Sequence, residues 1–337
     1  MILSYEKHIL QFKKPAGTSR GIYTNREIYI LTLRDPNNPF KVGRGECAPL
    51  PDLSCDALPN FEELLREICQ YFNGKISDNL RNYPSILFGI ETALKDFQSQ
   101  QKDILWDSDF TQGVQGIPIN GLIWMGSYSS MKEQIKEKLE KGFRCIKLKI
   151  GAIDFEEEYS LLKKIRSEYD ESEIILRVDA NGAFSPKSVH DKLEKLSKLK
   201  IHSIEQPIRA NQWEEMAALC KNTPLPIALD EELIGINNKI QKEELLDFIA
   251  PQYITLKPTL HGGIMGSTEW IELAKQRNIG YWITSALESN IGLNAIAQWC
   301  ATLGLSTHQG LGTGALFVEN FPTPLFIDGE HLWFKAE

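Results

Sequence analysis

The sequence predicts an α/β protein: a (β/α)7β-type TIM barrel preceded by an α+β capping domain. A chain of 337 residues, 42% of them hydrophobic, is long enough for a barrel of roughly 250 residues and a second, smaller domain. From about residue 117, strand-like apolar runs alternate with helical patterns. Five charged residues each end such a run, at intervals of 30, 26, 25 and 27 residues, which is the length of one strand, one helix and two loops: Lys149, Asp179, Glu205, Asp230 and Lys257.

The predicted capping domain covers residues 1–110, which lack the barrel rhythm. Its expected elements are two β-rich stretches and two helical patterns, at 22–34, 41–48, 61–72 and 86–98. The loops at 14–21 and 45–54 are rich in small and turn-forming residues, as are loops that cover a neighbouring active site.

The predicted barrel covers residues 111–312, and residues 313–337 are expected to return to the capping domain. Eight strands are expected near 117–124, 144–150, 174–179, 201–205, 226–230, 252–257, 280–285 and 307–311. Helical patterns fill the intervals, among them 154–168, 186–199 and 262–277.

Composition excludes several classes of protein. A net charge of −8 with interleaved acidic and basic residues argues against a nucleic-acid surface. No apolar run reaches the roughly 18 residues that span a bilayer, and charges interrupt the N-terminus, so we expect a cytoplasmic protein without a membrane partner. Six scattered cysteines without a CxxC argue against disulfides or zinc. The oligomeric state stays open.

Two lysines lie two residues apart in the apolar segment CIKLKIG, so both point to the same side of a strand. A lysine pair at a surface edge is the common alternative, but the apolar neighbours favour the barrel interior. A desolvated lysine beside a second cation loses its proton more readily. We therefore expect Lys149, nearer the strand's end, to act as a general base and Lys147 to lower its pKa.

Three acids end three consecutive strands. Alone, each would more often be a helix cap or a turn residue; together, Asp179, Glu205 and Asp230 would converge at the barrel mouth, where a cation would offset their repulsion. Oxygen ligands favour Mg²⁺, with Mn²⁺ as a possible substitute. Asn181 and Gln206 are expected to orient the carboxylates. Glu231 competes with Asp230 for the place of the third metal ligand, but the polarity of the strand favours Asp230.

The last group of candidates follows the sixth and seventh strands. Lys257 would face Lys149 across the barrel, although a lysine that caps a loop carbonyl is the alternative. Gly262 and Gly263 open a helix whose free N–H groups could bind a substrate anion. Ser285 and Glu288 suit substrate contact, with a helix cap as the alternative for Ser285. Two amines and a metal are suited to removing a proton α to a carboxylate.

The chain resembles the muconate-lactonizing subgroup of the enolase superfamily, through the KxK motif, the three acids and Lys257. Within that subgroup it resembles the o-succinylbenzoate synthase family almost end to end, in GRGECAPLP, DFEEEYSLLKKIR, DANGAFSP, IEQP, LKPTLHGG, TSALESNIGLNAIAQ and GLGTGALF. The seventh strand has no obvious histidine base, which weighs against a site like that of mandelate racemase. The eighth strand has no DxD of the kind dipeptide epimerases use, which disfavours that relative.

The resemblance implies a Mg²⁺-dependent lyase of menaquinone biosynthesis that acts on a small anionic carboxylate. It would dehydrate 2-succinyl-6-hydroxy-2,4-cyclohexadiene-1-carboxylate to 2-succinylbenzoate, with Lys149 as base and Lys257 as a fixed positive charge. The rival within the subgroup is racemisation of an N-succinylamino acid, or another N-acylamino acid, in which both lysines would exchange protons. A non-catalytic binding barrel is the rival from another class.

Overall fold

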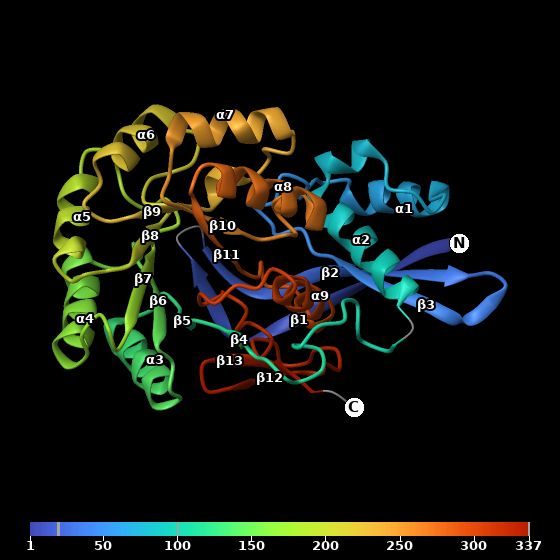
Figure 1. Ribbon diagram of the computed structural model, residues 1–337, viewed down its shortest axis with the longest axis horizontal. Coiled ribbons are helices and arrows are strands. Elements are labelled where there is room, and N and C mark those ends of the chain that lie inside the picture. Colours follow the sequence, from blue (N-terminus) through green and yellow to red (C-terminus); the bar gives the residue numbers. More distant parts are fainter. Residues whose placement is uncertain (19–20, 100, 336–337) are drawn as a thin grey trace.

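The computed structural model describes residues 1–18, 21–99 and 101–335. Its centre is a curved sheet of parallel strands, surrounded by helices on its outer side (Figure 1). The seven strands are adjacent in chain order: β5 (Gly121–Ile123), β6 (Cys145–Lys149), β7 (Ile175–Asp179), β8 (Ser203–Glu205), β9 (Ile227–Leu229), β10 (Tyr253–Leu256) and β11 (Gly280–Ile283). This arrangement confirms the α/β class and places seven of the eight expected strands within a few residues of their predicted positions.

Each strand leads into a helix, as right-handed βα units require. The helices are α3 (Tyr128–Glu140), α4 (Phe155–Glu168), α5 (Val189–Ser197), α6 (Trp213–Asn222), α7 (Lys239–Ile249), α8 (Gly263–Gln276) and α9 (Asn290–Ala301). The side chains of Ser127, Asp154, Asn238 and Ser289 accept backbone N–H groups at four helix starts, which satisfies donors that a helix leaves free. The main core lies between these helices and the sheet.

The first expected strand is present but divided in two, and the eighth is reduced to isolated bridges. The first is split into β4 (Ile117–Pro118) and β5, because Pro118 has no N–H to donate and cannot continue a central ladder. β4 instead pairs with β13 (His331–Phe334), which pairs with β12 (Leu325–Asp328). At the eighth position only Gln309 and Gly310 form isolated bridges, to Ile119 before β5 and to Thr284 after β11, so this segment touches both edges of the sheet.

The N-terminal region is an antiparallel sheet covered on one face by two helices. Its strands are β1 (Ile2–Thr18), β2 (Gly21–Asp35) and β3 (Asn38–Cys47), and its helices are α1 (Phe61–Tyr71) and α2 (Pro84–Gln98), with the 3-10 helix η1 (Asp78–Asn82) between them. A Cβ on Gly45 would lie 1.9 Å from the Gly89 carbonyl oxygen, so glycine lets α2 approach β3 closely. Sequence reasoning assigned no strand to β1, the longest strand.

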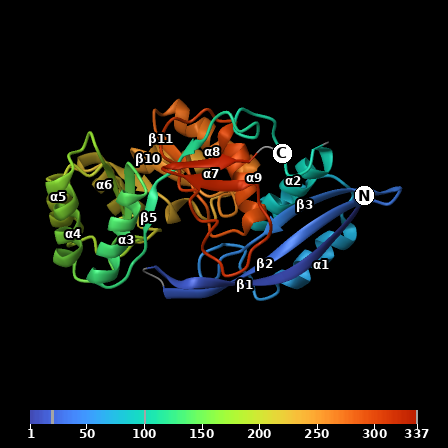
Figure 2. The same ribbon diagram turned by 90° about the horizontal axis from the view of Figure 1, so that it is seen from below.

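The other face of this sheet packs toward the half of the molecule that holds the parallel sheet, where β1 and β2 run along one side of the molecule (Figure 2). Leu10, Phe12 and Ile28 share an apolar cluster with Leu287 and Phe317. The Phe12 and Phe317 rings are 4.7 Å apart. Residues 316–318 thus contact β1, while β13 pairs with β4 through His331 and Leu332.

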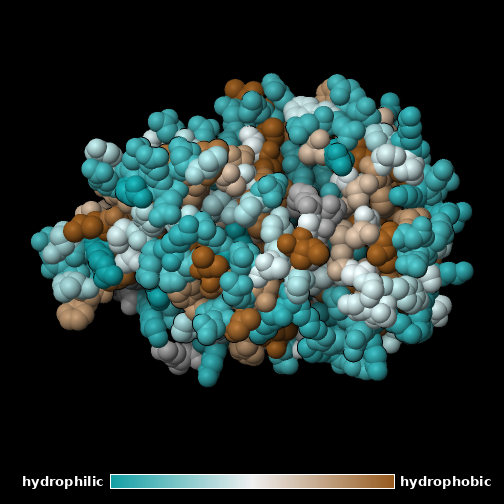
Figure 3. All heavy atoms as spheres, turned by 180° about the vertical axis from the view of Figure 1, so that it is seen from behind, coloured by the Kyte–Doolittle hydropathy of each residue, from teal (hydrophilic) through white to brown (hydrophobic). Residues whose placement is uncertain are grey.

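One face of the surface is mainly hydrophilic, with small separate hydrophobic areas (Figure 3). Among the helices of the described residues, none combines the length and the apolar character that crossing a bilayer requires.

Candidate active site

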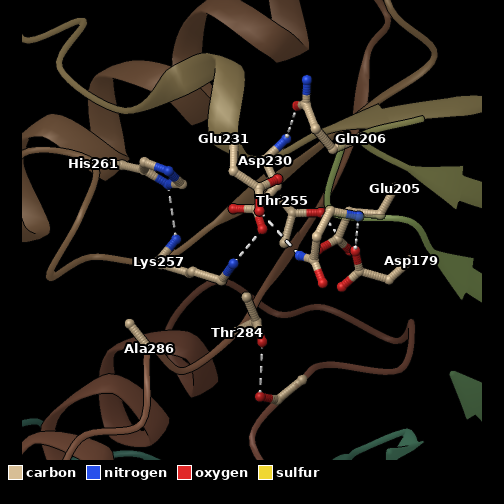
Figure 4. Close-up of polar contacts among 12 residues, drawn as sticks. Asp179, Glu205, Gln206, Asp230, Glu231, Thr255, Lys257, His261, Thr284 and Ala286 are labelled. Carbon is tan, nitrogen blue, oxygen red and sulfur yellow. Dashed lines mark hydrogen bonds and ion pairs between the residues drawn. The ribbon is translucent and has the colours of Figure 1, made fainter. Parts of the chain in front are cut away.

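Three buried carboxylates meet at the ends of adjacent strands. Asp179 and Glu205 are the last residues of β7 and β8 and are paired in register, and Asp230 directly follows β9. None of the three is more than 2% exposed. Figure 4 shows them pointing toward a common space beside Lys257. The structure therefore brings the three acids to the ends of adjacent strands, with lysine amines between them.

Lysine amines lie between these carboxylates. Lys147 Nζ is 2.6 Å from Glu205 Oε2 and 3.0 Å from Asp179 Oδ2. Lys149 Nζ is 3.1 Å from Asp179 Oδ2 and donates to Asn181 Oδ1 at 2.8 Å. Lys257 pairs with Asp230. Lys147 and Lys149 come from β6 and Lys257 follows β10, so the amines reach the acids from two separated parts of the sheet.

The charges of this cluster shift one another strongly. Burial opposes the ammonium form of Lys147, but Asp179 and Glu205 together outweigh burial and raise its pKa. Burial likewise disfavours ionised Asp179, yet Lys147 and Lys149 hold its pKa well below the ordinary range. Lys147 thus stays an ammonium ion, the charge state that its expected effect on Lys149 requires. Burial, followed by the charge of Asp179, raises the pKa of Glu205 to about 8.

The donor set fits a divalent cation. Glu205 Oε1 and Asp230 Oδ1 are buried and have no hydrogen-bond partner among the described residues. All three acids offer oxygen, the ligand atom that Mg²⁺ prefers. No ready-made cage of three histidine, cysteine, aspartate or glutamate side chains exists in the described part of the chain, since lysine amines occupy the space between the acids. Cation binding would require these amines to move aside.

Asn181 and Gln206 orient this cluster in different ways. Asn181 links the Lys149 amine to Glu231, to which its Nδ2 donates at 3.0 Å. Gln206 Oε1 accepts the backbone N–H of Asp230 at 3.2 Å, so Gln206 fixes the backbone that carries Asp230 and touches no carboxylate of the cluster. Since Glu231 faces Asn181 while Asp230 pairs with Lys257, the geometry favours Asp230 over Glu231 as the third acid.

Two expected substrate contacts are corrected by the structure. The N–H groups that follow Gly262 and Gly263 are already taken by a protein carboxylate, Glu91, so no substrate anion is needed there. Glu288 is fully buried. It accepts a hydrogen bond from the N–H of Ala286 at 2.8 Å and one from the hydroxyl of Thr259, and so links the loop after β11 to the loop after β10.

A pocket opens over the lysines. Ser285, the remaining predicted substrate contact, lines it together with Lys147, Lys149, Asp179, Asn181 and Lys257. Tyr23, Leu50 and Leu53 close it from the N-terminal region, and Trp124 lines it from the segment after β5. The loop at 45–54 therefore covers the site as predicted. The loop expected at 14–21 is instead strand where it is described: residues 14–18 belong to β1 and Gly21 to β2, and the two residues between them lie outside the described residues.

Sequence reasoning missed His261, which is buried and whose Nδ1 accepts the Lys257 backbone N–H at 2.9 Å (Figure 4). Burial lowers its pKa to about 3, so the ring is neutral and can accept. Its spacing of four residues from Lys257 was the available signal. Trp124 and Tyr23 gave none, because their places depend on how distant segments pack.

Comparisons with known proteins decide the family. Residues 130–333 match the enolase C-terminal domain-like family, and residues 19–97 match the MenC N-terminal domain. The o-succinylbenzoate synthase of Desulfotalea psychrophila is 44% identical over 98% of both chains. The chain belongs to the o-succinylbenzoate synthase family. This confirms the resemblance drawn from the sequence motifs.

Solved structures agree with this family membership. The crystal structure of MenC from Desulfotalea psychrophila has a TM-score of 0.87 and 41% identity, covering 99% of each chain. A dipeptide epimerase from Enterococcus faecalis, complexed with Mg and the dipeptide L-Leu-L-Tyr, has a TM-score of 0.83 but only 19% identity, over 100% of this chain and 97% of that one. The second likeness shows the shared fold alone.

Proposed function

We propose that this member of the family is an o-succinylbenzoate synthase, a hydro-lyase that dehydrates 2-succinyl-6-hydroxy-2,4-cyclohexadiene-1-carboxylate to 2-succinylbenzoate in menaquinone biosynthesis. The observation that carries the proposal is a pocket with Lys149 and Lys257 over three buried carboxylates, in a chain 44% identical along its length to a protein of that name. These groups suit removal of a proton next to a carboxylate.

We further propose that the sheet closes into the (β/α)7β barrel expected from the sequence, with residues 1–110 as cap, 111–312 as barrel and 313–337 as a returning segment. Hydrogen bonds support closure. The Asn120 N–H donates to the Gln309 carbonyl at 2.9 Å, and the Gly310 N–H donates to the Ile283 carbonyl at 2.8 Å. Barrel mouths at the carboxyl ends of strands are where active sites of this fold lie.

Asp179, Glu205 and Asp230 would hold Mg²⁺, or Mn²⁺ as a substitute. When bound, the ion would neutralise negative charge that develops on the substrate carboxylate. The unpartnered oxygens of Glu205 and Asp230 support this assignment.

Lys149 would carry both proton steps. Its neutral amine would remove the proton α to the ring carboxylate; the resulting ammonium would return a proton to the departing hydroxyl group on the same face, so that water leaves and the ring becomes aromatic. Asn181 Oδ1 lies 2.8 Å from the amine and would orient it. One group can serve as base and then as acid because its conjugate form is the proton donor.

Lys257 would act as a fixed cation. Burial opposes its charge, but Asp230 and Glu205 together raise its pKa, so the amine remains an ammonium ion near neutral pH. His261 fixes the residue through its backbone N–H, a contact that does not involve the amine. A positive charge in this position would stabilise the anionic intermediate.

The test is an assay of the purified protein with the cyclohexadiene substrate, following the absorbance of the aromatic product with and without EDTA. We expect turnover that EDTA abolishes and added Mg²⁺ restores. A second arm follows racemisation of an N-succinylamino acid, because both lysines line the pocket and could exchange protons. Racemisation without dehydration would contradict the proposal.

A further inference from the structure

A carboxylate of the N-terminal region reaches the helix that follows Lys257. Glu91 of α2 accepts the N–H groups of Ile264 at 2.6 Å and Met265 at 2.9 Å, in the first turn of α8. Gly263 makes room for it: a Cβ there would lie 2.2 Å from Glu91 Oε2, and its φ of +71° also favours glycine. The start of α8 is therefore built to receive this carboxylate.

A second carboxylate does the same at the next helix. Glu46, near the end of β3 and fully buried, accepts the N–H and hydroxyl of Ser289 at 2.8 and 2.5 Å and the N–H of Gly292 at 2.8 Å, at the start of α9. Here too a glycine leaves the space, because a Cβ on Gly292 would lie 2.8 Å from Glu46 Oε2. The loop before α9 carries Ser285, which lines the pocket.

A buried arginine adds a third link between the N-terminal region and this part of the pocket. Arg26 of β2 donates to the Pro49 carbonyl at 2.5 Å and to the Leu287 carbonyl at 3.2 Å. The pocket is lined by Leu50 and by Leu287, so Arg26 joins the loop that covers the site to the loop after β11.

The loops after β6 and β8, which also lie at the carboxyl ends of the parallel strands, are held by carboxylates from outside the N-terminal region. Glu158 of α4 accepts the N–H groups of Gly151 at 2.8 Å and Ala152 at 3.2 Å, directly after the strand that carries Lys149. Glu232 accepts the N–H of Asn211 at 2.7 Å in the loop after β8. The loops after β10 and β11 thus differ in taking carboxylates from the N-terminal region.

We propose that Glu46 and Glu91 are positioning residues for catalysis, which hold the loops that place Lys257 and Ser285. Half of the active site is then assembled only when the N-terminal region is docked through these carboxylates. This inference rests on the proposed synthase function for its kinetic consequences, but its structural part can be tested without any activity.

The first test is hydrogen–deuterium exchange of the full chain at pH 8, comparing wild type with Glu91→Gln and Glu46→Gln. Glutamine has one acceptor oxygen and would turn an NH₂ group toward backbone donors. We expect amides in residues 258–266 to exchange about tenfold faster in Glu91→Gln, and those in 286–293 in Glu46→Gln, because charge-assisted bonds to backbone N–H groups are lost. Amides in 150–154 should keep their wild-type rates.

Asp96→Asn is the matched control. Asp96 also lies on α2, is partly buried, and accepts a backbone N–H, that of Arg44 at 2.7 Å, but this partner belongs to β3 of the N-terminal region itself. We expect this variant to leave exchange at 258–266 and 286–293 unchanged. Faster exchange at these segments in Asp96→Asn, or unchanged exchange in both glutamine variants, would overturn the proposal.

Kinetics supply the second readout. We expect Glu91→Gln to lower kcat about tenfold with little change in KM, since a displaced catalytic group affects the reacting geometry more than binding. Asp96→Asn should keep wild-type kcat. Gly292→Ala, whose Cβ would lie 2.8 Å from Glu46 Oε2 and 2.9 Å from Glu288 Cβ, should speed exchange in 286–293 at least as much as Glu46→Gln. If the exchange results hold but wild type shows no dehydration, the proposed function fails and the positioning role stands; wild-type kcat in Glu91→Gln would overturn the catalytic role.

Discussion

The two lysines of the pocket lie in regions that are held in place differently. Around Lys149, the strands β6 to β8 pair in register, and the loop after β6 is fixed by Glu158, seven residues from Gly151. Around Lys257, the start of α8 is fixed by Glu91, 173 residues before its partner Ile264. The loop beside Lys149 is therefore held by a local contact, and the start of α8 beyond Lys257 by a contact that spans the chain.

This difference separates two kinds of dependence on the rest of the molecule. Local contacts form whenever the βα unit itself forms. The contacts of Glu46 and Glu91 require the N-terminal sheet and α2 to be in place, because these elements carry the carboxylates. Perturbing the N-terminal region should thus disturb Lys257 while leaving Lys149 in position.

The largest expected effect is loss of the proposed base. Lys149→Ala should lower kcat by about 10⁴-fold, at the top of the range for general acid–base residues, because one amine serves both proton steps. The measurement is product absorbance at saturating substrate, with Mn²⁺ affinity measured in parallel as a control for an intact cluster of acids. Activity within tenfold of wild type would place the base elsewhere.

A smaller effect is expected at Lys257, where charge rather than proton transfer matters. Lys257→Ala should lower kcat about 10²- to 10³-fold, as does loss of a group that stabilises a developing charge. Lys257→Arg keeps the charge but cannot give up its proton, so it should retain more activity than the alanine variant. Equal loss in a folded arginine variant would instead favour a proton-transfer role and the racemase alternative.

Glu46 and Glu91 should also make the free energy of unfolding depend on pH. Burial raises the pKa of both Glu46 and Glu91 to about 7, from an ordinary value of 4.5. The charged groups that act on them are Glu288 and Arg26 for Glu46, and Arg81 for Glu91. Each group binds a proton more readily in the folded chain, so its contribution to stability is full below pH 4.5 and is lost as the pH rises through 7.

For Glu46 this contribution should amount to about 3 kcal/mol between pH 4.5 and 8, to order of magnitude. The free energy of unfolding of Glu46→Gln, measured with urea across this range, should therefore fall less steeply with pH than that of wild type. Glu137→Gln serves as the control, because Glu137 is exposed and Lys141 lowers its pKa. A wild-type slope in Glu46→Gln would show that Glu46 stays ionised throughout.

The same division explains what sequence reasoning could predict. Asp179, Glu205 and Asp230 were found because each ends or directly follows an apolar strand, and adjacency in a parallel sheet brings strand ends together. The long strand β1 was missed, and so were the pocket residues Tyr23 and Trp124. Their positions depend on how distant segments pack, which no local period encodes.

The glycine pair at the start of α8 shows the limit in one place. Free N–H groups at a helix start correctly indicated an anion near Gly262 and Gly263. The sequence could not indicate that the anion is Glu91, because nothing near residue 91 marks a partner 173 residues away. A protein carboxylate and a substrate carboxylate satisfy the same donors.

The smallest expected effect tests whether the two regions are independent. Glu158→Gln weakens the loop after Lys149, and Glu91→Gln weakens the start of α8; each should lower kcat about tenfold on its own. The two carboxylates act on different loops and share no hydrogen-bond partner. Because the effects of distant, unconnected sites are additive in free energy, kcat of the double variant should fall by the product of the two single fold-changes, with an interaction energy within about 0.5 kcal/mol of zero.

The measurement is a double-mutant cycle on kcat at pH 8, with exchange at 150–154 and 258–266 confirming that each substitution loosens only its own loop. An interaction energy above about 1 kcal/mol would mean that Lys149 and Lys257 are positioned as one unit, and that the N-terminal region governs both.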